Sequence, residues 1–218
     1  MSKAINNIAV LVSGGGTNLQ SIIDNIHFGS CNANIKCVVS NVANVYALER
    51  TEKANIPSHV VAHGNYKNRQ DFENALIQIL EKHSVNTVIL AGFMRILEST
   101  FINHYPGRIL NIHPSLLPKY PGLNTHQKAI ENHDQTHGCS VHFATTELDD
   151  GPVILQASVP VLESDNAETL AKRVLEKEHI IYPMCVHWLC EGTIHHKNGV
   201  VYFNEQTLHS ALQLEQIT

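Results

Sequence analysis

Ile8-Ala-Val-Leu-Val-Ser-Gly-Gly-Gly-Thr-Asn18 is the stretch that decides the fold. Its first five residues form a continuous apolar run, which predicts a buried strand, and the three glycines predict a tight turn. Apolar residues then recur at helical spacing, at Leu19, Ile22, Ile23 and Ile26. A strand, a glycine-rich turn and a helix in this order are typical of an α/β fold.

Apolar runs and amphipathic segments alternate along the next hundred residues. We predict strands over residues 35–39, 58–62, 87–91 and 108–112, and helices over residues 43–54, 69–83 and 101–105. Because these strands are apolar almost throughout, they predict a parallel sheet with helices on both faces. The fold class is therefore α/β, with a doubly wound, mostly parallel sheet of Rossmann-like type.

The pattern changes after about residue 138, where Gly138 indicates the end of a helix. Two strands are predicted over residues 140–144 and 153–159, joined by the polar turn Glu147-Leu-Asp-Asp-Gly-Pro152. A long helix over residues 167–190 and a hairpin over residues 194–203, turning at Lys197-Asn-Gly199, follow. The length and the absence of a linker-like tract favour one domain over residues 1–218.

The composition limits the classes to which the chain can belong. Its 218 residues carry a formal net charge of −5, without the basic surplus of a nucleic-acid binder. No apolar run reaches membrane-spanning length and no signal-peptide core begins the chain, so we expect a cytoplasmic protein. The five cysteines lack C-x-x-C pairs and indicate reduced thiols, and the fifteen histidines lack metal-binding spacing, so no metal is expected.

The glycine-rich turn is a candidate binding element. A helix that starts directly after it presents free backbone N–H groups, which accept a phosphate or a carboxylate. It is not a Walker loop, because no Gly-Lys-Ser/Thr follows, and Leu19 takes the third glycine place of a dinucleotide fingerprint. The alternative is a tight turn with Thr17 or Asn18 capping the helix. Three adjacent glycines exceed what a cap needs, which favours an anion site.

Asn111 and His113 form a candidate catalytic pair. If the strand runs to His113, the two side chains lie two positions apart and point to one face. Pro114 then ends the strand, so both lie at its carboxyl end, where open α/β sheets bind ligands. An amide donor and an imidazole there can stabilise an oxyanion and move a proton. The alternative is that both side chains serve the loop backbone next to the prolines.

Two acidic positions complete the candidate set. The polar turn before Pro152 carries Asp149 and Asp150, which either stay solvated, or one of them approaches His113 and favours the protonated ring. Glu178 falls within the apolar stripe of the long helix. A carboxylate on such a stripe needs a protein partner or a ligand's amine or hydroxyl, unless the helix is rotated enough to expose it.

Four stretches of the sequence together resemble a known family. They are Val10-Leu-Val-Ser-Gly-Gly-Gly-Thr-Asn-Leu-Gln20, Leu90-Ala-Gly-Phe-Met-Arg-Ile-Leu97, Asn111-Ile-His-Pro-Ser-Leu-Leu-Pro-Lys-Tyr-Pro-Gly122 and Glu147-Leu-Asp-Asp-Gly-Pro-Val-Ile-Leu-Gln156. They resemble the phosphoribosylglycinamide formyltransferases, folate-dependent enzymes of purine biosynthesis, in their short bacterial form. The likeness covers essentially the whole chain, and the Asn-x-His-Pro-Ser-Leu-Leu-Pro block is specific for folate-dependent formyl transfer.

The resemblance implies an activity and a set of site residues. The activity is transfer of the formyl group of 10-formyltetrahydrofolate, a co-substrate, to the amine of 5-phosphoribosylglycinamide. The implied catalytic residues are Asn111, His113 and Asp149; the substrate side has Gly16, Thr17, Asn18 and Glu178; the folate side has Arg69, Met94, Arg95, Ile96, Leu97 and Asn111. The N-terminal half is then the phosphate side, and the C-terminal half carries the folate and catalytic loops. Gly15 and Asn124 stand where the family can have a larger polar residue and a histidine.

The expected partners are small molecules, without nucleic acid or membrane, and the chain is expected to be a monomer or homodimer.

Two rival functions use the same formyl chemistry. A formyltetrahydrofolate hydrolase delivers water in place of an amine and typically has an N-terminal regulatory domain, and a methionyl-tRNA formyltransferase usually has a tRNA-binding domain; neither domain is expected here. A nucleotide-binding module without catalysis is the third, but it leaves Asn111, His113 and Glu178 without a role, and no acidic residue ends the second strand at Ser40-Asn41.

Overall fold

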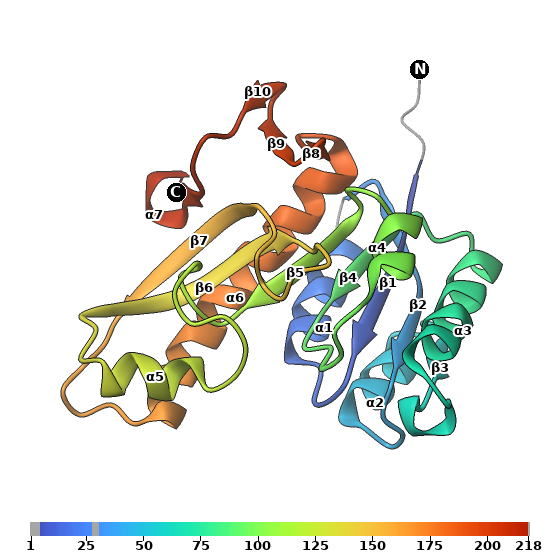
Figure 1. Cartoon of the computed structure of the whole chain (residues 1–218), viewed down its shortest axis with the longest axis horizontal. Helices are drawn as coiled ribbons and strands as arrows, with labels where there is room; N and C mark the ends of the chain where they lie inside the picture. Colours follow the sequence, from blue (N-terminus) through green and yellow to red (C-terminus); the bar gives the residue numbers. More distant parts are fainter. Residues whose placement is uncertain (1–4, 28–30, 218) are drawn as a thin grey trace.

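The computed structural model describes residues 5–27 and 31–217. Its core is an eight-stranded sheet with the order β11-β7-β6-β5-β4-β1-β2-β3 (Figure 1). The strands are β1 (Asn6–Val12), β2 (Ala33–Ser40), β3 (Ser58–Val60), β4 (Thr87–Leu90), β5 (Ile109–His113), β6 (Thr136–Phe143), β7 (Val153–Pro160) and β11 (Leu212–Gln213). β1 to β5 pair in parallel, whereas β6 is antiparallel to β5 and to β7. The predicted doubly wound, mostly parallel sheet is therefore confirmed.

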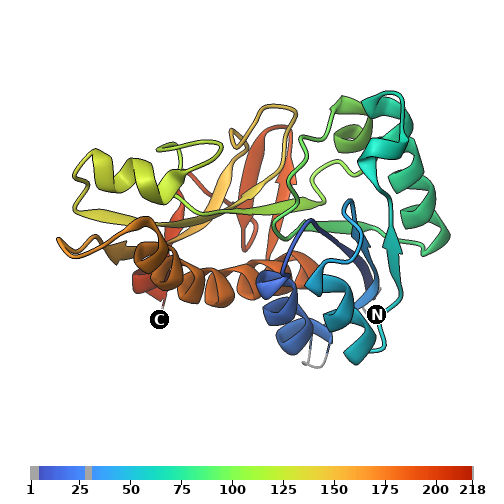
Figure 2. The same cartoon turned by 90° about the horizontal axis from the view of Figure 1, so that it is seen from below.

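Helices cover both faces of this sheet. They are α1 (Thr17–Ile22), α2 (Tyr46–Lys53), α3 (Arg69–Lys82), α4 (Ser99–His104), α5 (Thr125–Glu131), α6 (Ala167–Glu191) and α7 (Leu214–Ile217), with a π-helical turn at Ile23–His27 and a 3₁₀ turn at His63–Asn65. Figure 2 shows α1, α2 and α6 below the sheet and α3 and α4 above it. None of the helices within the described residues is long and apolar enough to cross a membrane.

β1 shows why the sheet needs both layers. Ile8, Val10 and Val12 are fully buried in the cluster that contains the apolar residues of α1 and α6. Ala9 and Leu11 point the other way and are fully buried with residues of α3 and α4. Successive side chains of a strand face opposite sides, so a continuous apolar run is stable only between two covered faces.

The C-terminal part differs most from the prediction. The expected hairpin is present as β8 (Ile194–Lys197) and β9 (Val200–Phe203), with Asn198 and Gly199 at positive φ. It belongs to a separate three-stranded sheet that also contains β10 (Gln206–Thr207). The sequence patterns did not predict β10, β11, α5 or α7, which are short and have little periodicity of their own.

The interpretation of Gly138 as a helix end is wrong. α5 ends at Glu131, His133 takes a left-handed φ of 53°, and Gly138 lies inside β6. A Cβ atom on Gly138 would collide with the backbone carbonyl of Ala157 in β7. Glycine is needed there because two backbones approach closely, not because a helix stops.

Tyr182 of α6 ties this helix to the two central strands. Its side chain is fully buried, and its hydroxyl donates to the carbonyls of Leu90, at 2.8 Å, and Leu110, at 3.1 Å. Leu90 is the last residue of β4, and Leu110 immediately precedes Asn111 in β5. The contact therefore fixes the end of β4 and the part of β5 just before Asn111 relative to α6.

Gly138→Ala should destabilise the fold by about 3 kcal/mol. The added methyl group would overlap the backbone carbonyl of Ala157, which cannot move aside as the end of a flexible side chain could. Gly64→Ala is the matched control, since no atom lies within 4 Å of its added Cβ, and it should change stability by less than about 0.5 kcal/mol. Urea unfolding of both variants measures the difference. Equal stability of the two variants would contradict the close approach of β6 and β7.

Candidate active site

The carboxyl ends of β1 and β4 lead into two loops that are held together. The Ser13 hydroxyl accepts a hydrogen bond from the Met94 amide at 2.8 Å and donates one to Asn41 Oδ1 at 2.5 Å. A cavity of about 280 Å³ lies between these loops, lined by Ser13, Gly14, Gly15, Gly16, Thr17, Asn18, Ala91, Gly92 and Met94. It lies where the strand order reverses between β1 and β4, which is the usual ligand position in doubly wound sheets.

Gly16 takes the N-cap position directly before α1. Its φ is +70°, and no side chain caps the helix, so the alternative in which Thr17 or Asn18 is the cap is wrong. A Cβ on Gly16 would lie 2.8 Å from the Cβ of Ala47, so the close approach of α2 also requires glycine. The Arg50 side chain braces the turn by donating from Nε to the Gly15 carbonyl at 2.9 Å.

Glu178 is buried, as its place in the apolar stripe predicted, with 7% of the residue exposed. Its partner is Asn18, whose Nδ2 donates to Oε2 of Glu178 at 2.6 Å. Burial raises the pKa of the Glu178 carboxyl, and the hydrogen bond from Asn18 lowers it by less. The contact brings the glycine-rich turn and the long helix, which are 160 residues apart, to one point.

Asp149 approaches His113, so the predicted contact is present. Oδ2 of Asp149 lies 3.4 Å from Nδ1 of His113, and Oδ1 lies 3.5 Å from Nδ2 of Asn111. The side chains of Asp149 and His113 are only 8% and 7% exposed. The backbone N–H of Gly122 donates to Oδ2 of Asp149 at 2.9 Å, which holds the carboxylate in place.

The His113 ring lies between two acceptors. Its Nε2 lies 2.8 Å from the carbonyl oxygen of Tyr120, so this nitrogen carries a proton and donates it. Its Nδ1 faces the Asp149 carboxylate. A doubly protonated ring is the form that donates to both neighbours, and this is the form that can supply a proton or stabilise a developing negative charge.

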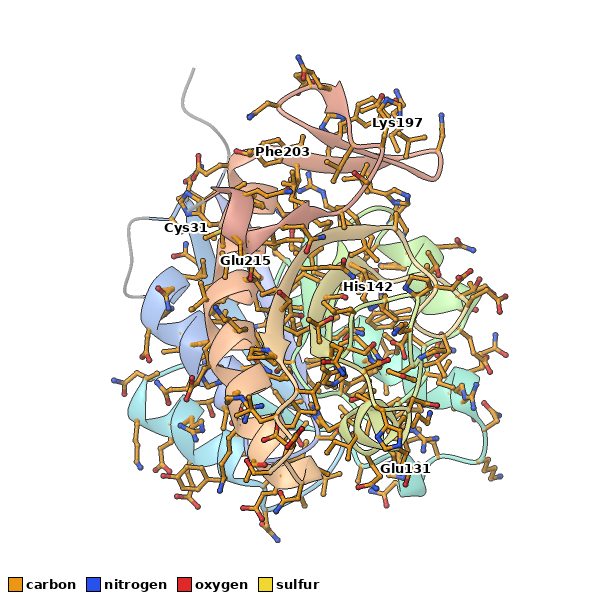
Figure 3. The ribbon with its side chains drawn as sticks, turned by 90° about the vertical axis from the view of Figure 1, so that its left-hand side faces the viewer. Cys31, Glu131, His142, Lys197, Phe203 and Glu215 are labelled. Atoms are coloured by element: carbon orange, nitrogen blue, oxygen red, sulfur yellow. The ribbon has the colours of Figure 1, made fainter. Side chains whose placement is uncertain are left out.

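His142 also belongs to this site, although the sequence patterns did not single it out. It lies in β6 opposite Asn111 of β5, and Figure 3 shows it within the body of the molecule. Its Nδ1 donates to the Phe143 carbonyl at 3.0 Å, so its Nε2 accepts from Asn111 Nδ2 at 3.0 Å. Burial lowers the pKa of His142 to about 4, so the ring is a neutral acceptor that orients the Asn111 amide. In the sequence, the one local sign was that His142 lies two residues after Ser140, so both side chains point to the same face of the predicted strand.

The residues implied for the folate side are distributed over two cavities. A cavity of about 90 Å³ is lined by Arg95, Ile96 and Leu97 together with Asn111 and Asp149. Met94, which is 64% exposed, lines the glycine-rich cavity instead. Arg69 is the first residue of α3 and forms a 3.2 Å ion pair with Glu98, both about half exposed, and it lines neither cavity.

Among residues 5–27 and 31–217, no group of three or more His, Cys, Asp or Glu side chains is arranged to hold a metal ion. The same part of the chain contains all five cysteines, and all five are free thiols.

Known proteins resemble the chain in sequence and in structure. The sequence model of the formyl transferase family matches residues 6–186. The phosphoribosylglycinamide formyltransferase of Escherichia coli K12 is 46% identical over 93% of this chain and 95% of its own length. The enzyme of that name from Haemophilus influenzae is 45% identical over 92% and 95%. The crystal structure of the Coxiella burnetii phosphoribosylglycinamide formyltransferase superposes with a TM-score of 0.89, at 43% identity over 95% of this chain and 99% of that one. This chain therefore belongs to the phosphoribosylglycinamide formyltransferase family of formyl transferases.

Proposed function

We propose that the chain transfers the formyl group of 10-formyltetrahydrofolate to the amine of 5-phosphoribosylglycinamide by direct attack, in purine biosynthesis. The observation that carries this proposal is the convergence of Asn111 and His113 on Asp149 at the carboxyl end of β5. These are the groups that formyl transfer to an amine needs: two donors for the oxygen of the tetrahedral intermediate and a carboxylate that stabilises a protonated imidazole.

The N-terminal half supplies the binding groups for the ribonucleotide. Gly16, Thr17 and Asn18 hold the phosphoribosyl portion, because their turn lines the 280 Å³ cavity and precedes a helix N-terminus. With a net charge of −5, the protein attracts a phosphate only through such local donors. The buried Glu178 carboxylate accepts a hydrogen bond from the substrate's amine and orients it toward the formyl carbon.

The C-terminal loops and the loop after β4 receive the folate. Backbone and side-chain groups of Arg95, Ile96 and Leu97 contact the pterin in the cavity next to Asn111. This cavity holds about 90 Å³, and the exposed side chain of Leu148, from the turn before β7, borders it. Met94 lines the glycine-rich cavity and directly precedes the folate-side residues 95–97, and the half-exposed guanidinium of Arg69 pairs with an anionic part of the folate.

The long contacts around Asp149 indicate how His113 and Asn111 act. At 3.4 and 3.5 Å, the donors on His113 Nδ1 and Asn111 Nδ2 are held only weakly by the carboxylate. When the amine attacks the formyl carbon, both donors turn to the developing oxyanion, while Asp149 favours the imidazolium. The intermediate then collapses by breaking the bond between the formyl carbon and N10 of the folate. A proton from His113 or a water reaches N10, and the formylated amine loses one proton.

The proposal is tested by incubating the protein with 10-formyltetrahydrofolate, with and without 5-phosphoribosylglycinamide, and following tetrahydrofolate release. We expect release that depends on the ribonucleotide, with formate absent. Release of formate at the same rate without the ribonucleotide would instead identify a formyltetrahydrofolate hydrolase. No turnover under either condition would favour another acceptor or a binding module.

His113→Ala and Asp149→Asn should each lower kcat about 10²–10³-fold, because each removes oxyanion stabilisation, and should change KM for both substrates far less. Asp150→Asn changes the exposed neighbouring carboxylate and is the matched control, with kcat expected within twofold of wild type. Steady-state kinetics at saturating folate provide the measurement. Near-normal kcat in either site variant would remove that residue from the mechanism.

Glu178→Gln should make stability less dependent on pH. The raised pKa of Glu178 means that the folded state binds its proton more tightly than the unfolded state, in which the carboxyl ionises at about pH 4.3. Unfolding free energy of the wild type therefore falls as the pH rises from about 4 through the raised pKa. The neutral amide of the Glu178→Gln variant removes this loss, so the variant gains on the wild type as the pH rises above about 4.

Urea unfolding at several pH values measures this difference. Glu176→Gln, an exposed position on the same helix, should follow the wild-type pH dependence. Parallel curves for the wild type and Glu178→Gln would mean that burial does not perturb Glu178.

A further inference from the structure

We propose that Tyr120 is a positioning residue for His113, and that Asp134 holds Tyr120 in this role through its hydroxyl group. This inference rests on the proposed catalytic role of His113. It concerns the loop between β5 and α5, residues 114–124, in which the carbonyl oxygen of Tyr120 lies at Nε2 of His113.

The backbone of Tyr120 is in an unfavourable conformation. Its φ is +56°, in the left-handed region that bulky side chains rarely adopt. The conformation turns the Tyr120 carbonyl oxygen toward Nε2 of His113, at 2.8 Å. Such a backbone persists only where surrounding contacts hold it, and these contacts often occur at functional sites.

Asp134 provides the hydrogen bond that holds the phenol of Tyr120, while the Ser115 hydroxyl lies 3.4 Å from the Tyr120 carbonyl oxygen. The phenol hydroxyl donates to Oδ2 of Asp134 at 2.8 Å, and Nζ of Lys119 lies 2.9 Å from Oδ1, so each carboxylate oxygen binds one of two consecutive residues. The Asp134 side chain is only 14% exposed, and its own backbone amide donates to Ala129 of α5. The hydrogen bond from Lys119 holds the pKa of the Asp134 carboxyl below its usual range, so the acceptor is a carboxylate at neutral pH.

The segment from Lys119 to Gly122 contacts both His113 and Asp149. The backbone carbonyl of Tyr120 accepts a hydrogen bond from Nε2 of His113. Two residues later, the Gly122 amide donates to Asp149 at 2.9 Å. With Nε2 fixed in this way, Nδ1 is the nitrogen that faces the reacting centre. Releasing the Tyr120 side chain frees the carbonyl to move and lets the ring rotate about its χ angles.

The other titratable groups around His113 are neutral or already described. Burial is the main cause that lowers the pKa of His126, of His137 to about 4 and of His142 to about 4. Asp149 is the carboxylate that faces the ring directly.

Tyr120→Phe tests the inference, because it removes the hydroxyl and keeps the ring and the backbone. We expect kcat to fall about tenfold while KM for both substrates stays within twofold, since the ring is misoriented in the transition state and not in binding. In ¹H–¹⁵N spectra of the imidazoles, the His113 Nε2–H signal should shift or broaden.

Variants at Asp134 distinguish the effect of losing the Tyr120–Asp134 hydrogen bond from a general loss of stability. Asp134→Ala should reproduce the effects of Tyr120→Phe, and the double variant should be no worse than either single one, because both remove the same contact. Asp134→Asn keeps an acceptor oxygen for the phenol and should restore most of kcat. Tyr202→Phe, a matched change in β9 of the separate sheet, should leave kcat and the His113 signal unchanged.

Wild-type kcat together with an unchanged His113 Nε2–H signal in Tyr120→Phe would overturn the inference, and so would equal loss of activity in Asp134→Asn and Asp134→Ala. Failure of the proposed function is distinguished by His113→Ala: full turnover in that variant removes His113 from the chemistry. The imidazole spectrum of Tyr120→Phe still tests whether the Tyr120–Asp134 hydrogen bond positions His113 in that case, because the measurement needs no substrate.

Discussion

The buried carboxylate of Asp149 is the group on which the reacting centre depends. A carboxylate that is only 8% exposed is costly unless it is paired, and here it accepts from a backbone amide and lies next to an imidazole and an amide. Asn111 and His113 come from the end of β5, and Gly122 comes from the following loop. The contacts that pair this one charge therefore hold the turn before β7, the end of β5 and that loop together. The same contacts give the site its polarity, with donors aimed at the place where negative charge develops.

A second pairing joins the two halves of the chain. Asn18 follows the first strand, and Glu178 lies near the middle of α6, yet their side chains meet at 2.6 Å. As a member of the formyltransferase family, the chain must bring an amine to a formyl carbon held by other loops, and this pairing joins the start of α1, directly after the glycine-rich turn, to α6. Loops that are far apart in sequence are thereby held in one geometry before any ligand arrives.

Local patterns predicted the features that depend on short spacing. Asn111 and His113 were found because two strand residues two apart share a face and a proline follows them, and Glu178 was found because it interrupts an apolar stripe. The contact of Asp149 with His113 came from family resemblance, since no spacing connects a turn to a strand 36 residues earlier. His142 and Tyr120 were missed for tertiary reasons. His142 faces Asn111 only through the antiparallel register of β5 and β6, and the left-handed backbone of Tyr120 depends on contacts across the loop. Gly138 was misread because a glycine required by close strand packing looks the same in sequence as a helix end.

α6 fixes the spacing between two sets of contacts at this edge of the sheet. Glu178 and Tyr182 lie four residues apart, about 6 Å along the helix axis, on the same side of the helix. One binds the turn after β1, and the other binds the carbonyls that end β4 and precede Asn111 in β5. The helical pitch thus sets the distance between the amine side and the formyl side. Over evolutionary time this segment of α6 can accept substitutions that keep its polar atoms, whereas insertion or deletion of a single residue would rotate one contact by about 100° relative to the other and break the alignment.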